Sequence, residues 1–187
     1  MVTTAALVLA AGGGSRFGRE TSKLLVPFRG RALVSWAVGA ALDAGLDETV
    51  VVMGAVDVAA AVPPGVTLLH NEAWVTGLAS SLRVGVDWCE RRSHASVVVG
   101  LGDQPLVPSE AWRAVAGSTG APVVVATYSG RRRNPVKLDS SVWSLLPVTG
   151  DEGARALMAS RPALVSEVAC PGDPADIDTV EDLRTWS

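Results

Sequence analysis

Three consecutive glycines, Gly12–Gly14, follow an apolar run near the start of the chain and are followed by Ser15 and Arg16. Glycine lets the backbone adopt positive φ and approach a ligand without a Cβ in the way. Successive amides in such a loop can bind an anion, and the guanidinium of Arg16 adds a planar set of donors for phosphate oxygens. Lys23, one of two lysines among sixteen basic residues, follows closely enough in sequence to reach the same anion. This stretch therefore predicts a phosphate-binding loop.

Two common phosphate-binding loops do not fit this stretch. The dinucleotide-binding fingerprint needs its third glycine where this chain has Phe17, and a P-loop needs Ser or Thr after its lysine, where this chain has Leu24. A nicotinamide-dependent dehydrogenase and a P-loop enzyme are therefore disfavoured. An ordinary turn remains the alternative, although a turn rarely needs three glycines followed by serine and arginine.

The elements around the loop follow from the alternation of apolar runs with amphipathic stretches. The apolar runs predict strands over 5–10, 49–53, 66–70, 95–101, 122–127, 135–138 and 163–168. The amphipathic stretches predict helices over 32–44, 80–91, 109–116, 140–146, 151–159 and 181–185. Strands that are apolar on both faces and separated by helices are typical of a parallel sheet covered on both sides. We therefore predict one three-layer α/β/α domain over residues 1–187, with a Rossmann-like, mostly parallel sheet.

Composition and charge exclude several classes of function. The chain has 187 residues, of which 48% are hydrophobic and 19% charged, and its net charge is −3. An acidic balance argues against a nucleic-acid-binding surface, and no apolar run reaches the roughly 18 residues of a membrane helix. The N-terminus lacks the features of a signal peptide, which predicts a cytoplasmic protein without a membrane partner. We predict free thiols at Cys89 and Cys170 and no catalytic role for His70 or His94.

Several blocks in order resemble the nucleotidyltransferases that transfer NMP groups to sugar phosphates, alditols and the molybdenum cofactor. The first block is Leu9-Ala10-Ala11-Gly12, continued by Gly14-Ser15-Arg16-Phe17-Gly18 and Lys23. Later blocks narrow the resemblance to the molybdenum cofactor cytidylyltransferase branch, and they lie at 71–74, 77–82, 101–105, 133–136, 150–155 and 176–183.

The resemblance implies a Mg²⁺-dependent transfer of CMP from CTP to the phosphate of molybdenum cofactor, with release of pyrophosphate. It implies catalytic roles for Arg16, Lys23 and Asp103. Mg²⁺ would be held by Asp103 and Asp178, with Asp176 as the other candidate for the second carboxylate, and one or two carboxylates suit this ion. The implied nucleotide-binding residues are Leu9, Ala10, Ala11, Gly12, Gly13, Gly14, Ser15, Arg16, Lys23, Gly77, Ser80, Ser81, Gly102 and Asp103.

The acceptor side is implied by the same resemblance. The nucleotide-binding part would cover about 1–120 and the acceptor-binding part about 121–187. Asn and Asp suit the polar edge of a phosphorylated pterin, and Arg suits its phosphate. The implied acceptor-binding residues are Arg133, Asn134, Pro135, Asp151 and Arg155. A molybdoenzyme or its maturation chaperone would receive the product.

Structural alternatives stay open for most of these residues. Asp103 would satisfy a turn ahead of Pro105, and Asp178 would cap the helix predicted at 181–185. The arginines 131–133 fit a solvated loop, and Asp151 fits an ion pair with Arg155 at a helix start.

Functional alternatives also stay open. They are a guanylyltransferase or a sugar-phosphate nucleotidyltransferase of the same fold, or a non-catalytic module that binds and delivers a cofactor. No physical property of the sequence selects the base, so the assignment of CTP depends on the resemblance.

Overall fold

A seven-stranded sheet forms the middle layer of the computed structural model, which describes residues 2–13 and 22–186. Within this part of the chain the strands lie in the order β5-β4-β1-β6-β8-β7-β9, and β8 alone runs antiparallel to its neighbours. The strands are β1 (Thr4–Ala10), β4 (Glu48–Met53), β5 (Thr67–His70), β6 (Ser96–Leu101), β7 (Val123–Tyr128), β8 (Arg131–Asp139) and β9 (Val165–Ala169).

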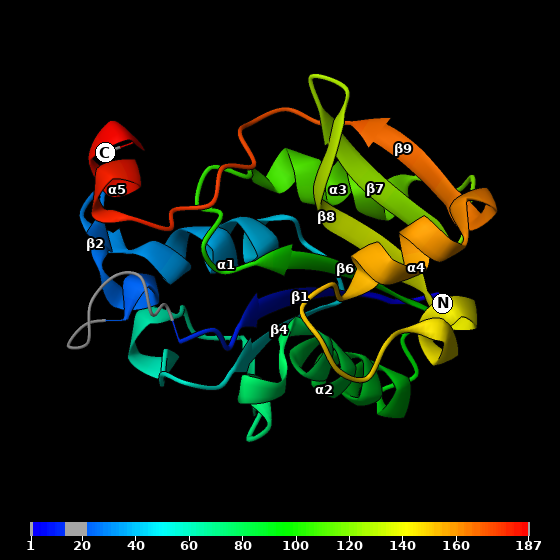
Figure 1. Cartoon of the computed structure of the whole chain (residues 1–187), viewed down its shortest axis with the longest axis horizontal. Coiled ribbons are helices and arrows are strands. Elements are labelled where there is room, and N and C mark those ends of the chain that lie inside the picture. The colour runs from blue at the N-terminus through cyan, green and yellow to red at the C-terminus, as the bar shows by residue number, and fades with distance from the viewer. Residues whose placement is uncertain (1, 14–21, 187) are drawn as a thin grey trace.

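Helices cover both faces of the sheet (Figure 1). The α-helices are α1 (Leu33–Asp43), α2 (Leu78–Arg91), α3 (Ser109–Gly117), α4 (Ala154–Ser160) and α5 (Val180–Trp186). The 3-10 helices are η2 (Lys23–Leu25), η3 (Ala59–Ala61), η4 (Trp74–Thr76), η5 (Ser140–Leu145) and η6 (Pro162–Leu164). No helix of the described residues has the length and apolarity needed to cross a bilayer.

Alternating side chains of β1 fill two separate cores. Leu7 and Leu9 pack on the face covered by α2, whereas Val8 and Ala10 pack on the face covered by α1 and α3. A strand that is buried on both faces is apolar throughout, because successive side chains point to opposite sides of the sheet. The predicted three-layer α/β/α fold with a mostly parallel sheet is thus confirmed.

Several predicted elements needed correction. Strand β8 begins at Arg131, so the arginines 131–133 lie in a strand and not in a loop. Helix α4 begins at Ala154, three residues later than predicted, because Gly153 stands at its N-cap with φ 51°. The prediction missed the hairpin of β2 (Pro27–Phe28) and β3 (Arg31–Ala32), and the helix predicted at 140–146 is the 3-10 helix η5.

Strand order places the loop after β1 beside the turn after β6. Strand β1 pairs with β4 on one side and with β6 on the other, and all three run in the same direction. The chain therefore crosses over β1 between β4 and β6, and their connections leave from the same edge of the sheet. Such a switch point, at the carboxyl ends of parallel strands, is where open α/β sheets bind ligands.

Hydrogen bonds to the carboxylate of Glu48 stabilise the opposite edge of the sheet, where β4 begins. The carboxylate of Glu48 accepts hydrogen bonds from Thr67 at 2.8 Å and Trp88 at 3.0 Å, and its other oxygen lies 2.8 Å from Nε2 of His94. Burial alone would raise the pKa of Glu48, but its hydrogen bonds, that with His94 foremost, lower it below 4.5. The ionised form is therefore the one that the fold stabilises.

We expect Glu48→Gln to lower the free energy of unfolding at pH 7 by about 1–3 kcal/mol, the cost of disrupting a buried hydrogen-bonded charge. Because the folded state lowers the pKa of Glu48, its contribution is present above pH 4.5 and is lost as the pH falls through the folded-state value. Urea unfolding at pH 7 and pH 3.5 measures both effects. Glu90→Gln, on the exposed face of α2, is the control. An equal difference between wild type and Glu48→Gln at both pH values would contradict the assignment.

Candidate active site

A cavity of about 440 Å³ opens at the switch point between β1 and β6. The backbone amide of Gly102 donates to the carbonyl of Leu9 at 2.9 Å, so the first residue after β6 stays paired with β1. The cavity is lined by Leu9, Ala10, Ala11, Gly12, Gly13, Lys23, Leu24, Trp74, Val75, Gly77, Leu78, Ser81, Leu101, Asp103, Asp151 and Asp178. Five of the predicted nucleotide-binding residues, those at 9–13, thus form one wall.

The remainder of the predicted glycine loop falls outside the described residues. This applies to Gly14, Ser15 and Arg16, and their predicted roles stay predictions. At the end of the described part, a Cβ on Gly13 would lie 3.3 Å from the six-membered ring of Trp74. A larger residue at this position would therefore crowd the indole that forms the neighbouring wall.

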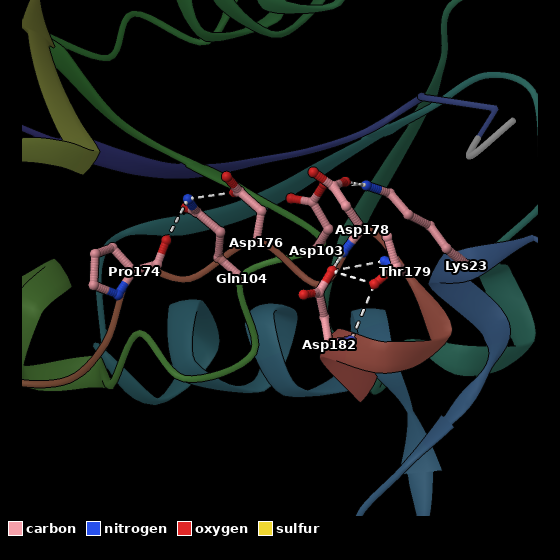
Figure 2. Close-up of polar contacts among 8 residues, drawn as sticks. All are labelled: Lys23, Asp103, Gln104, Pro174, Asp176, Asp178, Thr179 and Asp182. Atoms are coloured by element: carbon pink, nitrogen blue, oxygen red, sulfur yellow. Dashed lines mark hydrogen bonds and ion pairs between the residues drawn. The ribbon is translucent and has the colours of Figure 1, made fainter. Parts of the chain in front are cut away.

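Lys23 lies between two carboxylates (Figure 2). Its ammonium is 2.6 Å from Oδ2 of Asp103 and 2.6 Å from Oδ1 of Asp178. Burial alone would lower the pKa of Lys23, but the charges and hydrogen bonds of the two carboxylates raise it above its ordinary value. The lysine is therefore fully charged at physiological pH.

Buried neighbours position these three side chains. Lys23 begins η2, which is anchored by the buried side chain of Leu24. Asp103 lies in the turn after β6, and its carbonyl accepts a hydrogen bond from the amide of Ile177 at 3.0 Å. The Ile177 side chain is fully buried against Phe28 and Leu33. Burial of Ile177 thus places the adjacent Asp178 against the strand turn.

Asp178 is not the cap of α5, contrary to the alternative considered for it. The amide of Asp182 donates to Oγ1 of Thr179, and Oδ2 of Asp182 accepts from the amide of Thr179 at 2.8 Å. This reciprocal pair is a capping box in which Thr179 is the cap. The Asp178 carboxylate therefore remains available to the site.

Asp176 faces a different partner. Its Oδ1 accepts from Nε2 of Gln104 at 2.8 Å, and Figure 2 shows it on the far side of Asp103 from the lysine. Burial and the nearby charge of Asp103 raise the pKa of Asp176, and the bond from Gln104 opposes this shift. Of the two candidates for the second carboxylate, Asp178 is the one that shares a cation with Asp103.

The carboxylates of Asp103 and Asp178 fit a divalent cation. Oδ1 of Asp103 is buried and has no hydrogen-bond partner among the described residues, so it leaves a lone pair for a further cation. No cluster of three or more His, Cys, Asp or Glu with metal-site geometry occurs in the described part. Two carboxylates suffice for Mg²⁺ or Mn²⁺, because these ions complete their shells with phosphates and water.

The predicted base and ribose segment divides into lining and supporting residues. Gly77, with φ 108°, and Ser81 both line the cavity. Ser80 does not line it, because its hydroxyl donates to the carbonyl of Gly77 and accepts from the buried Asn71. A Cβ on Gly77 would lie 2.5 Å from the carbonyl oxygen of Gly150, so only glycine allows the loop before Asp151 to dock there.

The predicted acceptor residues do not all converge. Asp151 lies in the cavity, outside α4, and its Oδ1 accepts from the amide of Leu78 at 3.4 Å. The ion pair with Arg155 is not formed, and Arg155 is exposed away from the cavity. Arg133 is also exposed, whereas Asn134 and Pro135 line a small separate hollow beside Leu101.

Trp74, Val75 and Leu78 line the cavity although the sequence did not predict them as site residues. Two of them fall within blocks that carried the resemblance. Trp74 could have been singled out because small-molecule sites are lined mainly by hydrophobic and aromatic side chains, and it stands in a block that carried the resemblance. Val75 carried no such signal; its side chain is 71% exposed at the rim of the cavity.

Comparisons with known proteins agree with this geometry. The family model described as the MobA-like NTP transferase domain matches residues 6–166. The chain is 32% identical to nicotine blue oxidoreductase of Paenarthrobacter nicotinovorans over 192 residues, covering 95% of this chain and 93% of that protein.

Solved structures extend the similarity to the whole fold. Rv0371c of Mycobacterium tuberculosis H37Rv has a TM-score of 0.84 at 30% identity, with 98% of this chain and 97% of that chain covered. A structure of Rv0371c in complex with manganese has a TM-score of 0.79 at 28% identity and covers 99% and 98%. The inositol-1-phosphate CTP transferase of T. maritima shares the fold, with a TM-score of 0.71 at 16% identity and 97% and 95% covered.

The cavity lies where the strand order switches, it is lined by the start of a glycine loop, and a family model matches most of the chain around it. The protein therefore belongs to the MobA-like NTP transferase family and carries a nucleotidyltransferase domain.

Proposed function

We propose that the protein transfers CMP from CTP to the phosphate of a phosphorylated pterin, the molybdenum cofactor, with the help of Mg²⁺. The observation that carries this proposal is the convergence of Lys23, Asp103 and Asp178 beside the glycine loop, within one cavity. The choice of CTP and of the pterin rests on the sequence resemblance described above.

The reaction needs positioning and charge neutralisation more than covalent work by the protein. An oxygen of the acceptor phosphate attacks the α-phosphorus of the nucleotide, the bond to the β-phosphate oxygen breaks, and pyrophosphate leaves. The backbone of the glycine loop would hold the triphosphate, while Lys23 and Arg16 would neutralise its charge. A cavity of about 440 Å³ is within the range of small-molecule sites.

Asp103 and Asp178 would hold the divalent cation. When bound there, the cation supplies positive charge for the phosphate oxygens. The solved complex of the relative Rv0371c with manganese supports a divalent cation in a protein of this fold. Mg²⁺ is proposed as the physiological ion because it binds carboxylates together with phosphates.

The acceptor would enter past Asp151, which lines the same cavity and accepts a hydrogen bond from Leu78, the first residue of α2. Its carboxylate can accept hydrogen bonds from the polar edge of a pterin. Arg133, Asn134, Pro135 and Arg155 lie outside this cavity, so their contribution would require a larger acceptor or a partner protein. A molybdoenzyme or its chaperone would fill that role. We propose that the reaction takes place in the cytoplasm.

A second candidate function is an oxidation–reduction reaction of the kind that the name nicotine blue oxidoreductase states. The similarity to nicotine blue oxidoreductase over nearly the whole chain favours it. Such a reaction needs a reductant, and the loop at 12–17 lacks the third glycine of the dinucleotide fingerprint. The lysine and the paired carboxylates suit a triphosphate with a metal better than they suit a nicotinamide.

Thermal unfolding with CTP, GTP, ATP, UTP and NADPH, each with and without Mg²⁺, separates these functions. We expect Mg-CTP to stabilise the protein most. At about 100 times its Kd, the ligand should add about 2.7 kcal/mol to the free energy of unfolding. GTP in first place would select the guanylyltransferase alternative. Stabilisation by NADPH but by no Mg-NTP would contradict a transferase.

We expect Asp103→Asn and Asp178→Asn each to slow pyrophosphate release from CTP and acceptor by at least about 100-fold, because each removes a carboxylate ligand of the cation that would neutralise the reacting phosphates. Asp176→Asn should reduce the rate less than Asp178→Asn, since its carboxylate faces Gln104. Asp87→Asn should not change the rate, because Asp87 is the half-exposed partner of Arg83 in an ion pair on α2. An Asp178→Asn enzyme that matches wild type would remove this residue from the metal site.

A further inference from the structure

Among the described residues, Lys23 is the cation that pairs with the two carboxylates proposed to hold the metal. Its ammonium lies 2.6 Å from one oxygen of each, and 13% of its side chain is exposed, against 19% for Asp103 and 40% for Asp178. An ammonium has three donors, and two of them are used here. The ammonium thus holds one oxygen of each carboxylate that a divalent cation would share, and it leaves Oδ1 of Asp103 without a partner among the described residues.

We propose that Lys23 is the counter-ion of the metal site in the nucleotide-free protein, so that a divalent cation binds well only after a nucleotide has drawn Lys23 away. This inference rests on the metal site of the proposed function. It assigns to Lys23 a second role, in addition to binding phosphate, because it determines the order in which metal and nucleotide bind.

Electrostatics gives the reason for such a counter-ion. Without a cation, two carboxylates that converge on one point repel each other, and this would oppose the docking of the chain end at Asp178 against the turn at Asp103. Asp176 adds a third carboxyl group nearby. Lys23 offsets this repulsion, but a cation so close to both oxygens also repels a second cation.

A triphosphate would reverse this arrangement. Its oxyanions offer Lys23 an alternative set of acceptors beside Gly12 and Gly13, the start of the glycine loop, which line the same cavity. Once Lys23 moves to the phosphates, Oδ2 of Asp103 and Oδ1 of Asp178 are free for the metal. Metal and nucleotide would then strengthen each other's binding by the same factor, as linkage requires.

Mn²⁺ titration of the nucleotide-free protein, followed by electron paramagnetic resonance, tests the counter-ion role. We expect Lys23→Gln to bind Mn²⁺ at least about tenfold more tightly than wild type. Lys137→Gln is the matched control, because Lys137 is the other lysine and its ammonium donates to the carbonyls of Ala116 and Ser118, outside the cavity lining. Equal or weaker Mn²⁺ binding by Lys23→Gln, or no binding by any variant, would overturn the proposal.

Addition of a non-transferable CTP analogue measures the coupling. We expect the analogue to tighten Mn²⁺ binding more in wild type than in Lys23→Gln. The two proposals can fail separately. A protein that binds Mn²⁺ in this pattern but transfers no CMP would support Lys23 as the counter-ion and would contradict the proposed function. Equal coupling in both proteins would refute the counter-ion alone.

A measurement on wild type avoids any folding defect of the variant. Amine-reactive labelling followed by mass spectrometry reports on Lys23 and Lys137 separately. We expect saturating Mn²⁺ to speed the labelling of Lys23 several-fold, because the displaced ammonium loses its carboxylate partners, and to leave Lys137 unchanged. An unchanged rate at Lys23 would count against displacement.

Discussion

An ammonium held between two carboxylates joins three segments that are far apart in the sequence. Lys23 comes from the 3-10 helix η2, Asp103 from the turn after β6, and Asp178 from the segment before α5. The ion pairs alone would not order these segments, because the cost of removing the charges of Lys23 and Asp103 largely from water offsets much of their attraction. Buried neighbours do so: Leu24 anchors the lysine, and Ile177 packs against Phe28 and Leu33 beside the last aspartate. The charges then determine what the resulting cavity can bind.

The sheet imposes the other constraint. Because β1 lies between β4 and β6, the glycine loop and the Asp103 turn leave adjacent strands in the same direction. The start of α2 faces the same cavity, since Gly77 allows the loop at Gly150 and Asp151 to dock against it. The predicted division at about residue 120 assigned the C-terminal segment to the acceptor-binding part. Through Asp178, this segment also reaches the cavity that Gly12 and Gly13 line. Residues of both predicted parts of the domain therefore line one cavity.

Local pattern sufficed for the fold, because strands buried on both faces are apolar throughout, as β1 is. The sequence also predicted that Lys23 and Asp103 share one site, and in the structure both line the cavity together with Gly12 and Gly13. The prediction failed at two helix starts: Gly153 delays α4 and leaves Asp151 outside the helix, and Thr179 caps α5 through a capping box with Asp182, a local pattern that the sequence contains. Arg133 and Arg155 suited a phosphate by residue type, but residue type does not determine which surface a side chain faces. The wall formed by Trp74 depends on packing against Gly13, which no local pattern encodes.

The decisive experiment on this site is a crystal structure with Mn²⁺ and a non-transferable CTP analogue, in which the anomalous signal of manganese is recorded. We expect one manganese peak within bonding distance of Asp103, Asp178 and the α-phosphate, with Lys23 turned from the carboxylates to the phosphates. A manganese bound elsewhere, or a nucleotide outside the cavity between β1 and β6, would contradict this expectation.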